Sequence, residues 1–437
     1  TACSSSSKTS GKTYNYVYGS DPATLDYLAT NKKNMTTAVS NGVDGLFEND
    51  QYGNLKPSVA EDWSVSQDGL TYTYKIRKGL KWYTSDGEEY ANVTAKDFVT
   101  GLKHAADTNS EAIYLLQNSV KGLNDYLSGA NKDFSNVGIK AVDDYTLQYT
   151  LSQPEPYWNS KLTYSVTWPV NGDFLKSKGK DFGKSTDPTS ILYNGPYLLK
   201  ALTTKSSIEF TKNENYWDKD HVYFDNIKLT YDDGSDQESL ERNFTDGVYN
   251  LARLFPTSSN YSKVEKQYKD NIFYTQPGSA VEGVGINIDR QTYGHTSKEN
   301  DQQKTSTKTA LLNKDFRQSL GFAIDRTNYA AQLNGKEGGS TAVRNIFVKP
   351  DFVQADGKDF GTMVMDQLPA YGDEWSGVNL ADSQDGLYNP EKAKAEFAKA
   401  KEALQAEGVQ FPIHLDVPVN QSSKITVNQV QSIKQSV

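Results

Sequence analysis

One continuous block, residues 57–98, constrains most strongly what this chain can fold into; it reads PSVAEDWSVSQDGLTYTYKIRKGLKWYTSDGEEYANVTAKDF. Its acidic beginning predicts the end of a helix. From Leu70 to Arg77, aromatic and aliphatic residues alternate with polar ones, the period-two pattern of a strand with one buried face. Gln67, Asp68 and Gly69 supply a turn before that strand. The block therefore predicts several elements in a fixed order.

A helix is predicted at the end of this block. Thr94 stands three residues before Asp97, the spacing of a capping box in which each side chain satisfies an amide at the start of a helix. The apolar residues Phe98 and Leu102 follow at helical spacing. The sequence thus predicts that a buried helix begins directly after Thr94.

As an ordered string, the block resembles the signature of the extracellular oligopeptide-binding proteins of ABC importers, which carry runs of the form LAExW, DGLTYTFxLRxxxKW and DGxxxTAxDF. The matching residues are Val59, Ala60, Glu61, Trp63, Asp68 to Tyr74, Arg77, Lys81, Trp82, Asp86, Gly87, Thr94, Ala95, Asp97 and Phe98. The segment YTSDGEEYANVTAKDF resembles the streptococcal members in particular. Further agreement occurs at Asp21, Pro22, Leu25, Gly45 to Phe47, Asn194 to Tyr197 and Asn215 to Asp218, so that the resemblance covers nearly the whole chain.

The resemblance implies an α/β, two-lobed periplasmic-binding-protein-like fold of class II with an extra inserted domain. A chain of 437 residues also exceeds what one core normally serves. The implied parts are a tether at 1–13, a first lobe at 14–48 and 163–271, an inserted domain at 49–162 and a second lobe at 272–437. Because Ile425, Val430, Ile433 and Val437 predict a helix that runs to the last residue, the second lobe is expected to be incomplete.

Composition limits the kinds of partner. A formal charge of −9 and a pI near 5.2 argue against nucleic acid, because phosphate binding needs clustered Lys and Arg. The 28 tyrosines suit strands and wet binding clefts, where a ring packs while its hydroxyl reaches water. No stretch approaches the roughly 18 apolar residues of a membrane helix. We therefore expect that only an N-terminal lipid contacts the membrane.

That lipid is expected on Cys3, the only cysteine of the chain. A small residue directly before Cys, at the head of a serine-rich run, resembles the end of a bacterial lipoprotein signal. The alternative is a cysteine without a function near the start of the sequence. The first interpretation places the protein on the extracellular face of the cell membrane, anchored by lipid, in a Gram-positive-type bacterium.

Further elements follow from local patterns. Ser207–Lys212 predicts a strand with Ile208 and Phe210 buried, and Phe224–Tyr231 predicts a second one. The polar run Arg290–Thr309 predicts an exposed, disordered loop.

Two helices are predicted in the later part of the chain. One runs from Asn313 to Ile324. The other follows Asn389 and Pro390 and ends at Gly408. Its predicted buried stripe consists of Ala393, Phe397, Ala400 and Leu404.

Motifs for catalysis are missing from the sequence. HExxH is absent, and four scattered histidines with one cysteine supply a zinc site poorly. GKDFGKS at 179–185 is one residue too short for a phosphate loop, and the aspartates at 232–236 lack the spacing of a calcium loop. We therefore expect no enzyme activity, no metal and no cofactor.

The expected site follows from the resemblance and from what all peptides share, which is their backbone. A protein that accepts many sequences can bind the peptide as an added strand. In the first lobe, the resemblance points to Ala38, Val39, Ser40 and Asn41. In the second lobe, it points to Gly283, Val284 and Gly285, and to Val417, Val419, Asn420, Gln421, Ser422 and Ser423 after a predicted strand IHLD.

Aromatic residues would form a second layer of the site. Trp375 resembles a tryptophan that lines the peptide pocket; the alternative is a hydrophobic plug between a loop and a helix. Trp63 and Trp82 are predicted to be core residues. Many family members place an Asp shortly after the second-lobe strand, whereas Asn420–Ser423 contains no carboxylate. We therefore expect that a salt bridge to the peptide's N-terminus is not needed.

The function implied is that of a monomeric substrate-binding protein, which captures extracellular oligopeptides between its lobes and delivers them to the permease subunits of an ABC transporter. The shape that the permease recognises would be the closed one. Alternatives are a surface receptor or adhesin that senses peptides without transport, and a binder of another solute such as a dipeptide, a metal chelate or an oligosaccharide. A secreted glycosidase is a third and more distant reading.

Overall fold

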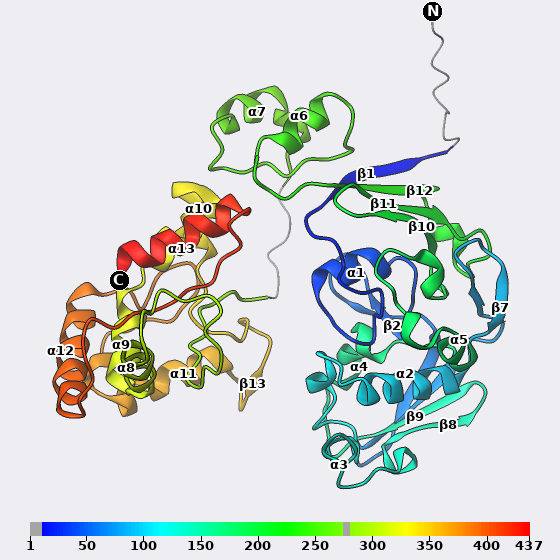
Figure 1. The fold of residues 1–437 in the computed structure, drawn as a ribbon, viewed down its shortest axis with the longest axis horizontal. Helices are drawn as coiled ribbons and strands as arrows, with labels where there is room; N and C mark the ends of the chain where they lie inside the picture. Colours follow the sequence, from blue (N-terminus) through cyan, green and yellow to red (C-terminus); the bar gives the residue numbers. More distant parts are fainter. Residues whose placement is uncertain (1–10, 274–279) are drawn as a thin grey trace, which may run out of the picture. The chain divides into compact units, whose positions relative to one another are not determined.

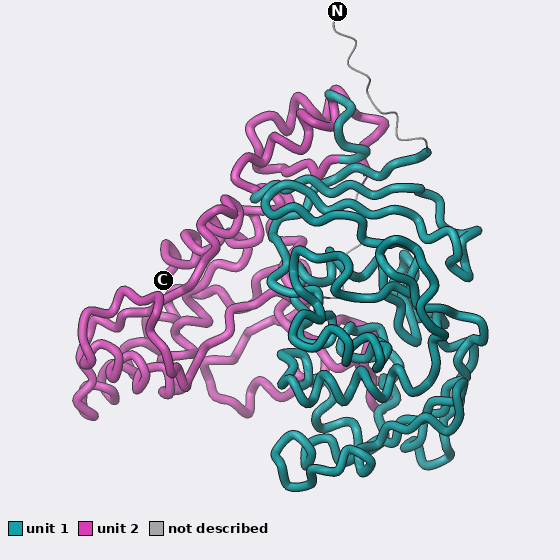
Figure 2. Tube along the Cα trace, turned by 45° about the vertical axis from the view of Figure 1, so that its right-hand side comes forward, with its two compact units in different colours: residues 1–233, 246–251 teal, residues 234–245, 252–437 magenta. Residues whose placement is uncertain are grey.

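The computed structural model describes residues 11–273 and 280–437 (Figure 1). The chain divides into two compact units (Figure 2). Unit 1 comprises Thr1–Asp233 and Asp246–Leu251, and unit 2 comprises Gly234–Thr245 and Ala252–Val437. The finer three-part division expected from the sequence stays a prediction.

The first sheet of unit 1 collects strands from both ends of the unit. Its order is β1-β12-β11-β10, formed by β1 (Thr13–Tyr18), β12 (Asn226–Tyr231), β11 (Ser207–Lys212) and β10 (Tyr197–Thr203). β1 runs parallel to β12, whereas the other neighbours are antiparallel. Ile208 and Phe210 are buried, so both strand predictions in this region are confirmed.

The second sheet contains the strand predicted between Leu70 and Arg77. Its order is β4-β5-β9-β8, formed by β4 (Ala60–Val65), β5 (Thr71–Ile76), β9 (Thr146–Thr150) and β8 (Ile139–Asp143). The helix end predicted before this strand is wrong, because those residues form β4. Gly69, with a φ of +72°, closes the hairpin that pairs β4 with β5, and this pairing outweighs the local acidic pattern.

Helix α2 (Ala95–Asp107) packs on β8 and β9 and begins where the sequence predicted. Asp97 accepts a hydrogen bond from the backbone N–H of Thr94 at 3.0 Å and another from the indole N–H of Trp82 at 3.0 Å. The hydroxyl of Thr94 is buried without a partner, so the carboxylate forms the effective half of the cap.

One continuous core holds unit 1 together. Trp82 lies in it with no exposed surface, as predicted. The prediction for Trp63 is wrong, because 44% of its surface is exposed. Trp63 lies on β4, where one ring face stacks on Tyr72 at a centroid distance of 6.1 Å, and among the described residues β4 is an edge strand with no neighbour beyond it.

Short elements complete unit 1. They are α1 (Lys33–Val39), β2 (Phe47–Asn49), β3 (Leu55–Pro57), β6 (Lys81–Tyr83), β7 (Glu89–Asn92), α3 (Leu123–Ser128), α4 (Trp158–Lys161) and α5 (Gly172–Lys178).

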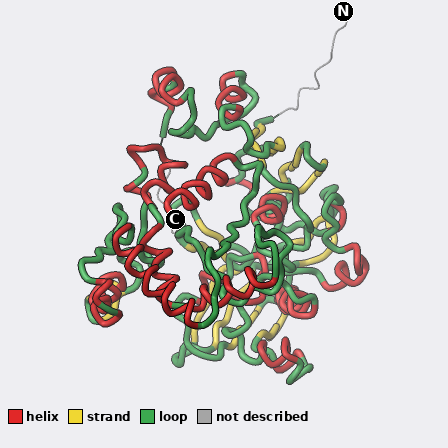
Figure 3. Tube along the Cα trace, turned by 60° about the vertical axis from the view of Figure 1, so that its left-hand side comes forward, coloured by secondary structure: helices red, strands yellow, loops and turns green. Residues whose placement is uncertain are grey.

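Unit 2 is built mainly from helices, which are red in Figure 3. They are α6 (Ser239–Thr245), α7 (Tyr261–Gln267), α8 (Asp301–Leu312), α9 (Lys314–Ala323), α10 (Arg326–Gly338), α11 (Phe360–Gln367), α12 (Pro390–Ala406) and α13 (Lys424–Ser436). Its described strands are the short pair β13 (Gln354–Ala355) and β14 (Lys358–Asp359). None of the helices in the described ranges is both long and apolar enough to cross a membrane.

The helices α9 and α12 pack on each other and confirm their predictions. Asn313 caps α9 by accepting from the N–H of Phe316 at 2.9 Å, and Asn389 caps α12 by accepting from Lys392 at 3.1 Å. Phe397 was predicted to be buried but is 39% exposed. Its ring packs edge-on against that of Phe411 at 5.8 Å, at the margin of the helix pair.

The predicted loop Arg290–Thr309 is wrong in its second half, because α8 begins at Asp301. Asn300 caps this helix by accepting from the N–H of Gln303 at 2.9 Å. The predicted strand IHLD is also wrong, since residues 412–419 belong to no strand or helix. The helix predicted near the end of the sequence is confirmed as α13, which Ser423 caps.

Candidate functional site

The four predicted residues of the first lobe lie at the end of α1, not on a strand. Ala38 and Val39 are fully buried in the core, whereas Ser40 is exposed and Asn41 is half-buried. Two carbonyls are already used, since that of Val39 accepts from Gly42 and that of Asn41 accepts from Tyr197 at 3.0 Å. None of the four residues lies on a strand, and their binding of a peptide stays a prediction, in which Ser40 and Asn41 are the members of this set with surface left for a ligand.

The predicted residues of the second lobe lie on two exposed segments. We call 281–289 the glycine segment, because it contains Gly283 and Gly285, and 412–419 the proline segment, because it contains Pro412 and Pro418. Within the described part of the chain, the backbone groups of both segments form no hydrogen bond to other backbone groups. Val284 is 55% and Val417 is 43% exposed. Apart from the carbonyl of His414 and the backbone groups of Asp289, which bond to side chains, both segments in the described part of the chain thus offer backbone amides and carbonyls to which a peptide strand can bind.

Four further predicted residues, Asn420 to Ser423, follow the proline segment. Asn420 and Gln421 are exposed, and the side chain of Asn420 accepts from the N–H of Ser422 at 3.1 Å in a turn. Ser423 is committed to the cap of α13. Its hydroxyl therefore has a structural partner already.

One carboxylate of the proline segment binds the loop that follows the glycine segment. Asp416, in the proline segment, accepts from Arg290 Nη1 at 2.6 Å, Thr296 Oγ1 at 2.7 Å and Lys298 Nζ at 2.5 Å. Its second oxygen accepts from the backbone N–H of Ser297 at 2.8 Å and from that residue's hydroxyl at 2.9 Å. We call this set the Asp416 clasp.

The clasp is largely dehydrated. The side chain of Lys298 is 2% exposed and that of Asp416 is 10% exposed. Burial alone would raise the pKa of Asp416, but the hydrogen bonds from Lys298, Ser297, Thr296 and Arg290 lower this pKa far below its ordinary value. Residues 290–298, predicted to be exposed and disordered, are therefore anchored.

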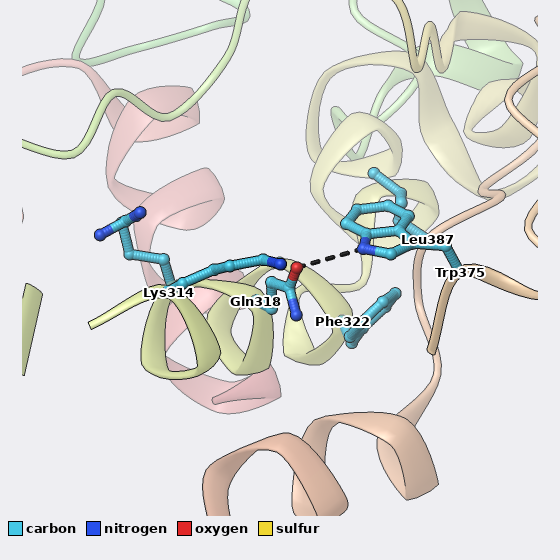
Figure 4. Close-up of a pocket in the computed structure, with 7 residues that line it drawn as sticks. Lys314, Gln318, Phe322, Trp375 and Leu387 are labelled. Carbon is cyan, nitrogen blue, oxygen red and sulfur yellow. Dashed lines mark hydrogen bonds between the residues drawn. The ribbon is translucent and has the colours of Figure 1, made fainter. Parts of the chain in front are cut away.

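Trp375 lines a cavity of about 300 Å³ in unit 2, together with residues of α9 (Figure 4). The lining residues are Lys314, Arg317, Gln318, Gly321, Phe322, Trp375 and Leu387. The indole N–H of Trp375 donates to Gln318 Oε1 at 3.1 Å, and its ring lies 5.3 Å from that of Phe322. Trp375 is thus fixed against a helix while it borders an open space, so both interpretations made from the sequence remain compatible with its contacts.

Gln318 holds the tryptophan in place. Its amide nitrogen donates to Glu374 at 3.0 Å and to the buried Glu396 at 3.1 Å, while its oxygen accepts from Trp375. With all these groups engaged, Gln318 orients the wall of the cavity instead of binding a ligand itself.

A buried carboxylate of unit 1 was missed by the sequence analysis. Asp44 accepts from the hydroxyl of Tyr216 at 2.5 Å, and its backbone N–H donates to Asn194 at 2.7 Å. Burial raises the pKa of Asp44 to about 7, against the opposing effect of the Tyr216 hydrogen bond. The signal was present, because these residues belong to or adjoin three of the short runs that carry the family resemblance.

Three exposed tyrosines on unit 1 were missed as well. Tyr114, Tyr157 and Tyr164 are 62%, 57% and 46% exposed. The ammonium of Lys161 lies 5.6 Å from the ring centre of Tyr157 and donates to the carbonyl of Leu115 at 3.0 Å. Exposed rings of this kind can bind ligands, but single tyrosines carry no distinguishing sequence pattern.

In the described residues, no group of three or more His, Cys, Asp or Glu side chains is arranged to hold a metal ion. Cys3, the expected lipid attachment site, lies outside the described residues.

Solved structures of peptide-binding proteins have a fold similar to that of this chain. OppA from Listeria monocytogenes bound to peptide is similar with a TM-score of 0.69 and 23% identity, covering 98% of this chain and 75% of that chain. The pheromone receptor PrgZ gives 0.69 and 22%, with the same coverage. The predicted class II α/β fold is thereby confirmed.

The chain belongs to the bacterial extracellular solute-binding proteins, family 5, whose model it matches over residues 54–437. Three curated relatives are similar to it. The oligopeptide-binding protein AmiA of Streptococcus pneumoniae is 70% identical over 100% of this chain and 67% of its own length. AliA of the same species is 64% identical over 100% and 66%, and SarA of Streptococcus gordonii is 62% identical over 97% and 64%. The chain thus spans about two thirds of the length of these relatives.

Proposed function

We propose that this chain binds extracellular oligopeptides and delivers them to the permease subunits of an ABC importer. One observation carries the proposal: proteins 60–70% identical to it, over essentially its whole length, are oligopeptide-binding proteins. The proposal contains no chemical step and no cofactor. Its output is a bound peptide and the shift in conformation that the peptide causes.

The mode of binding proposed is recognition of the peptide backbone. The glycine and proline segments support it, since within the described residues their backbone groups form no hydrogen bond to other backbone groups, and Gly283 and Gly285 permit close approach of another chain. Ser40 and Asn41 of unit 1 remain part of the proposed site through their side chains. Trp375 is proposed to border a pocket for one peptide side chain.

We further propose that the peptide's N-terminus is bound without a salt bridge in this part of the site. Asn420–Ser423 contains no carboxylate, and the oxygens of Asp416 are occupied by the clasp. Free and N-acetylated forms of one peptide are therefore expected to bind with the same Kd in isothermal titration calorimetry. A loss of tenfold or more on acetylation would contradict this proposal.

A lipid on Cys3, a position on the extracellular face of the membrane and a monomeric state complete the proposal. Metabolic labelling with a palmitate analogue should mark the wild type and spare Cys3→Ser. The variant should move from the membrane fraction to the medium. Equal labelling of the two forms would reject lipid attachment at this residue.

The test of the function is native mass spectrometry of the purified protein, followed by fragmentation of the molecules it releases. Peptides of mixed sequence are expected, and they would also give the preferred length. A bound sugar, metal chelate or single dipeptide would replace the proposal by another solute. Uptake of labelled peptide by cells with and without the gene separates transport from peptide sensing at the surface.

A further inference from the structure

The geometry assigns Asp416 the role of a positioning residue, which holds the glycine and proline segments in the arrangement that receives a peptide. This inference rests on the proposed function. It concerns a residue that contacts no ligand in the proposal and acts through the backbone on either side of it.

The first argument is connectivity. Arg290 directly follows the glycine segment, and Asp416 lies within the proline segment, immediately before Val417. The bond of 2.6 Å between Arg290 Nη1 and Asp416 therefore joins the two segments. In an ordinary sheet, a ladder of backbone hydrogen bonds fixes the relative position of two strands. Because neither segment has backbone pairing in the described residues, this side-chain contact fixes the relative position of the two segments instead.

The second argument is the number and direction of the donors. Arg290, Thr296, Ser297 and Lys298 all come from one loop and converge on one carboxylate. Charge-assisted bonds of 2.5–2.6 Å to a carboxylate that is 10% exposed are strong and directional. Replacement of Asp416 would leave the ammonium of Lys298 buried without its anion.

The third argument is the small number of other restraints on the proline segment. The hydroxyl of Thr307 in α8 donates to the carbonyl of His414 at 3.3 Å, and that of Ser306 accepts from the N–H of Gln410 at 3.2 Å. Both contacts precede Asp416. Between Asp416 and the turn at Asn420, the clasp is the nearest restraint on the backbone that would pair with a peptide.

The test compares Asp416→Asn, the double variant Asp416→Asn/Lys298→Met and the wild type. The double variant also removes the ammonium of Lys298, which Asp416→Asn alone would leave buried without an anion. It therefore separates an effect on folding from an effect on the arrangement of the two segments. Asp382→Asn is the matched control, because Asp382 pairs with Arg344 at 3.3 Å elsewhere in unit 2. The probe is a fluorescein-labelled library of random nonapeptides, measured by fluorescence anisotropy alongside the Tm of each protein.

We expect Asp416→Asn to weaken peptide binding at least tenfold and to lower the Tm. The double variant is expected to regain most of the Tm but not the affinity, and Asp382→Asn should keep wild-type affinity. Hydrogen exchange supplies a second measurement: the peptide should slow exchange at 281–289 and 417–419 in the wild type and not in the double variant.

Wild-type affinity in the double variant would overturn the positioning role, as would an equal loss in Asp382→Asn. Failure of the wild type itself to bind the peptide library would instead overturn the proposed function. The two failures are therefore distinguishable.

Discussion

At the scale of residues, two buried carboxyl groups show how the surroundings of a side chain shift its pKa. Burial raises the pKa of Asp44 to about 7 and that of Asp97 to about 6. Each accepts a hydrogen bond from an aromatic side chain, Tyr216 for Asp44 and Trp82 for Asp97. Neither bond fully offsets the cost of burying the charge.

The titration of Asp44 should be visible in the pH dependence of the unfolding free energy. Because its pKa is higher in the folded protein than in the unfolded chain, its contribution is fully present below about pH 4 and is lost as pH rises through about 7. Each pKa unit corresponds to about 1.4 kcal/mol. Asp44→Asn should therefore make the decline in the unfolding free energy between pH 4 and 8 smaller, as measured with urea, while the part due to Asp97 stays.

The exposed Asp86→Asn is the control and should leave that decline unchanged. If Asp44→Asn unfolds with the same pH profile as the wild type, Asp44 does not titrate in this range.

The two tryptophans of the block at 57–98 should differ in their effect on stability. Trp82→Ala removes a fully buried ring and should cost about 3–5 kcal/mol of unfolding free energy. Trp63→Ala removes a ring that is 44% exposed and should cost about 1 kcal/mol. Guanidinium unfolding of both variants checks the ranking, and equal costs would contradict the burial described here.

These tryptophans also show how far the burial of a single side chain could be predicted from the sequence alone. Both occur in one motif, and the motif predicts that each is important to the fold. Whether a ring is covered depends on the neighbours of its strand, and β4 lies at the edge of a sheet whose order is set by residues 139–150. The residues around Trp63 in the sequence do not determine the order of the strands in this sheet, so they could not predict that its ring is partly exposed.

At the scale of elements, capping residues were the most reliable signals. Asn313 and Asn389 were predicted to begin helices and do so. The helix α8 was missed because its run DQQKTSTKTALL has little apolar periodicity, although Asn300 offered a cap of the same kind. The strand in IHLD failed for a different reason: a strand needs a partner, and the described residues provide none for it.

The cap of α9 gives a quantitative prediction. Asn313→Ala should lower the unfolding free energy of unit 2 by about 1 kcal/mol, because the N–H of Phe316 loses its acceptor. Asn313→Asp retains an acceptor and should stay close to the wild type. Thermal unfolding followed by circular dichroism measures both, and a stable Asn313→Ala would show that the cap is redundant.

At the scale of the whole molecule, the two units differ in their cores. Unit 1 has one large cluster of buried apolar side chains, whereas the described cluster of unit 2 consists of Ala310, Phe316, Ala400, Leu404 and Val409. Unit 2 also exposes Phe347 and Phe352, each at 75%. The sequence predicted more than one domain from length alone, but the difference in core size follows from packing that no local pattern records.

Limited proteolysis should show this difference. Unit 2 is expected to be cleaved first, leaving a resistant fragment that corresponds to the unit 1 residues up to Asp233. Mass spectrometry of the fragments over time gives the order of cleavage. Equal rates of loss for the two units would show that they unfold as one.

The parallel pairing of β1 with β12 has a mechanical consequence. The six residue pairs from Thr13–Asn226 to Tyr18–Tyr231 lie along one line. A pull on the chain ahead of Thr13, directed along the strand, loads all of their hydrogen bonds together in shear instead of opening them one after another. A domain tethered through its amino-terminal end would thus resist drag at its first strand.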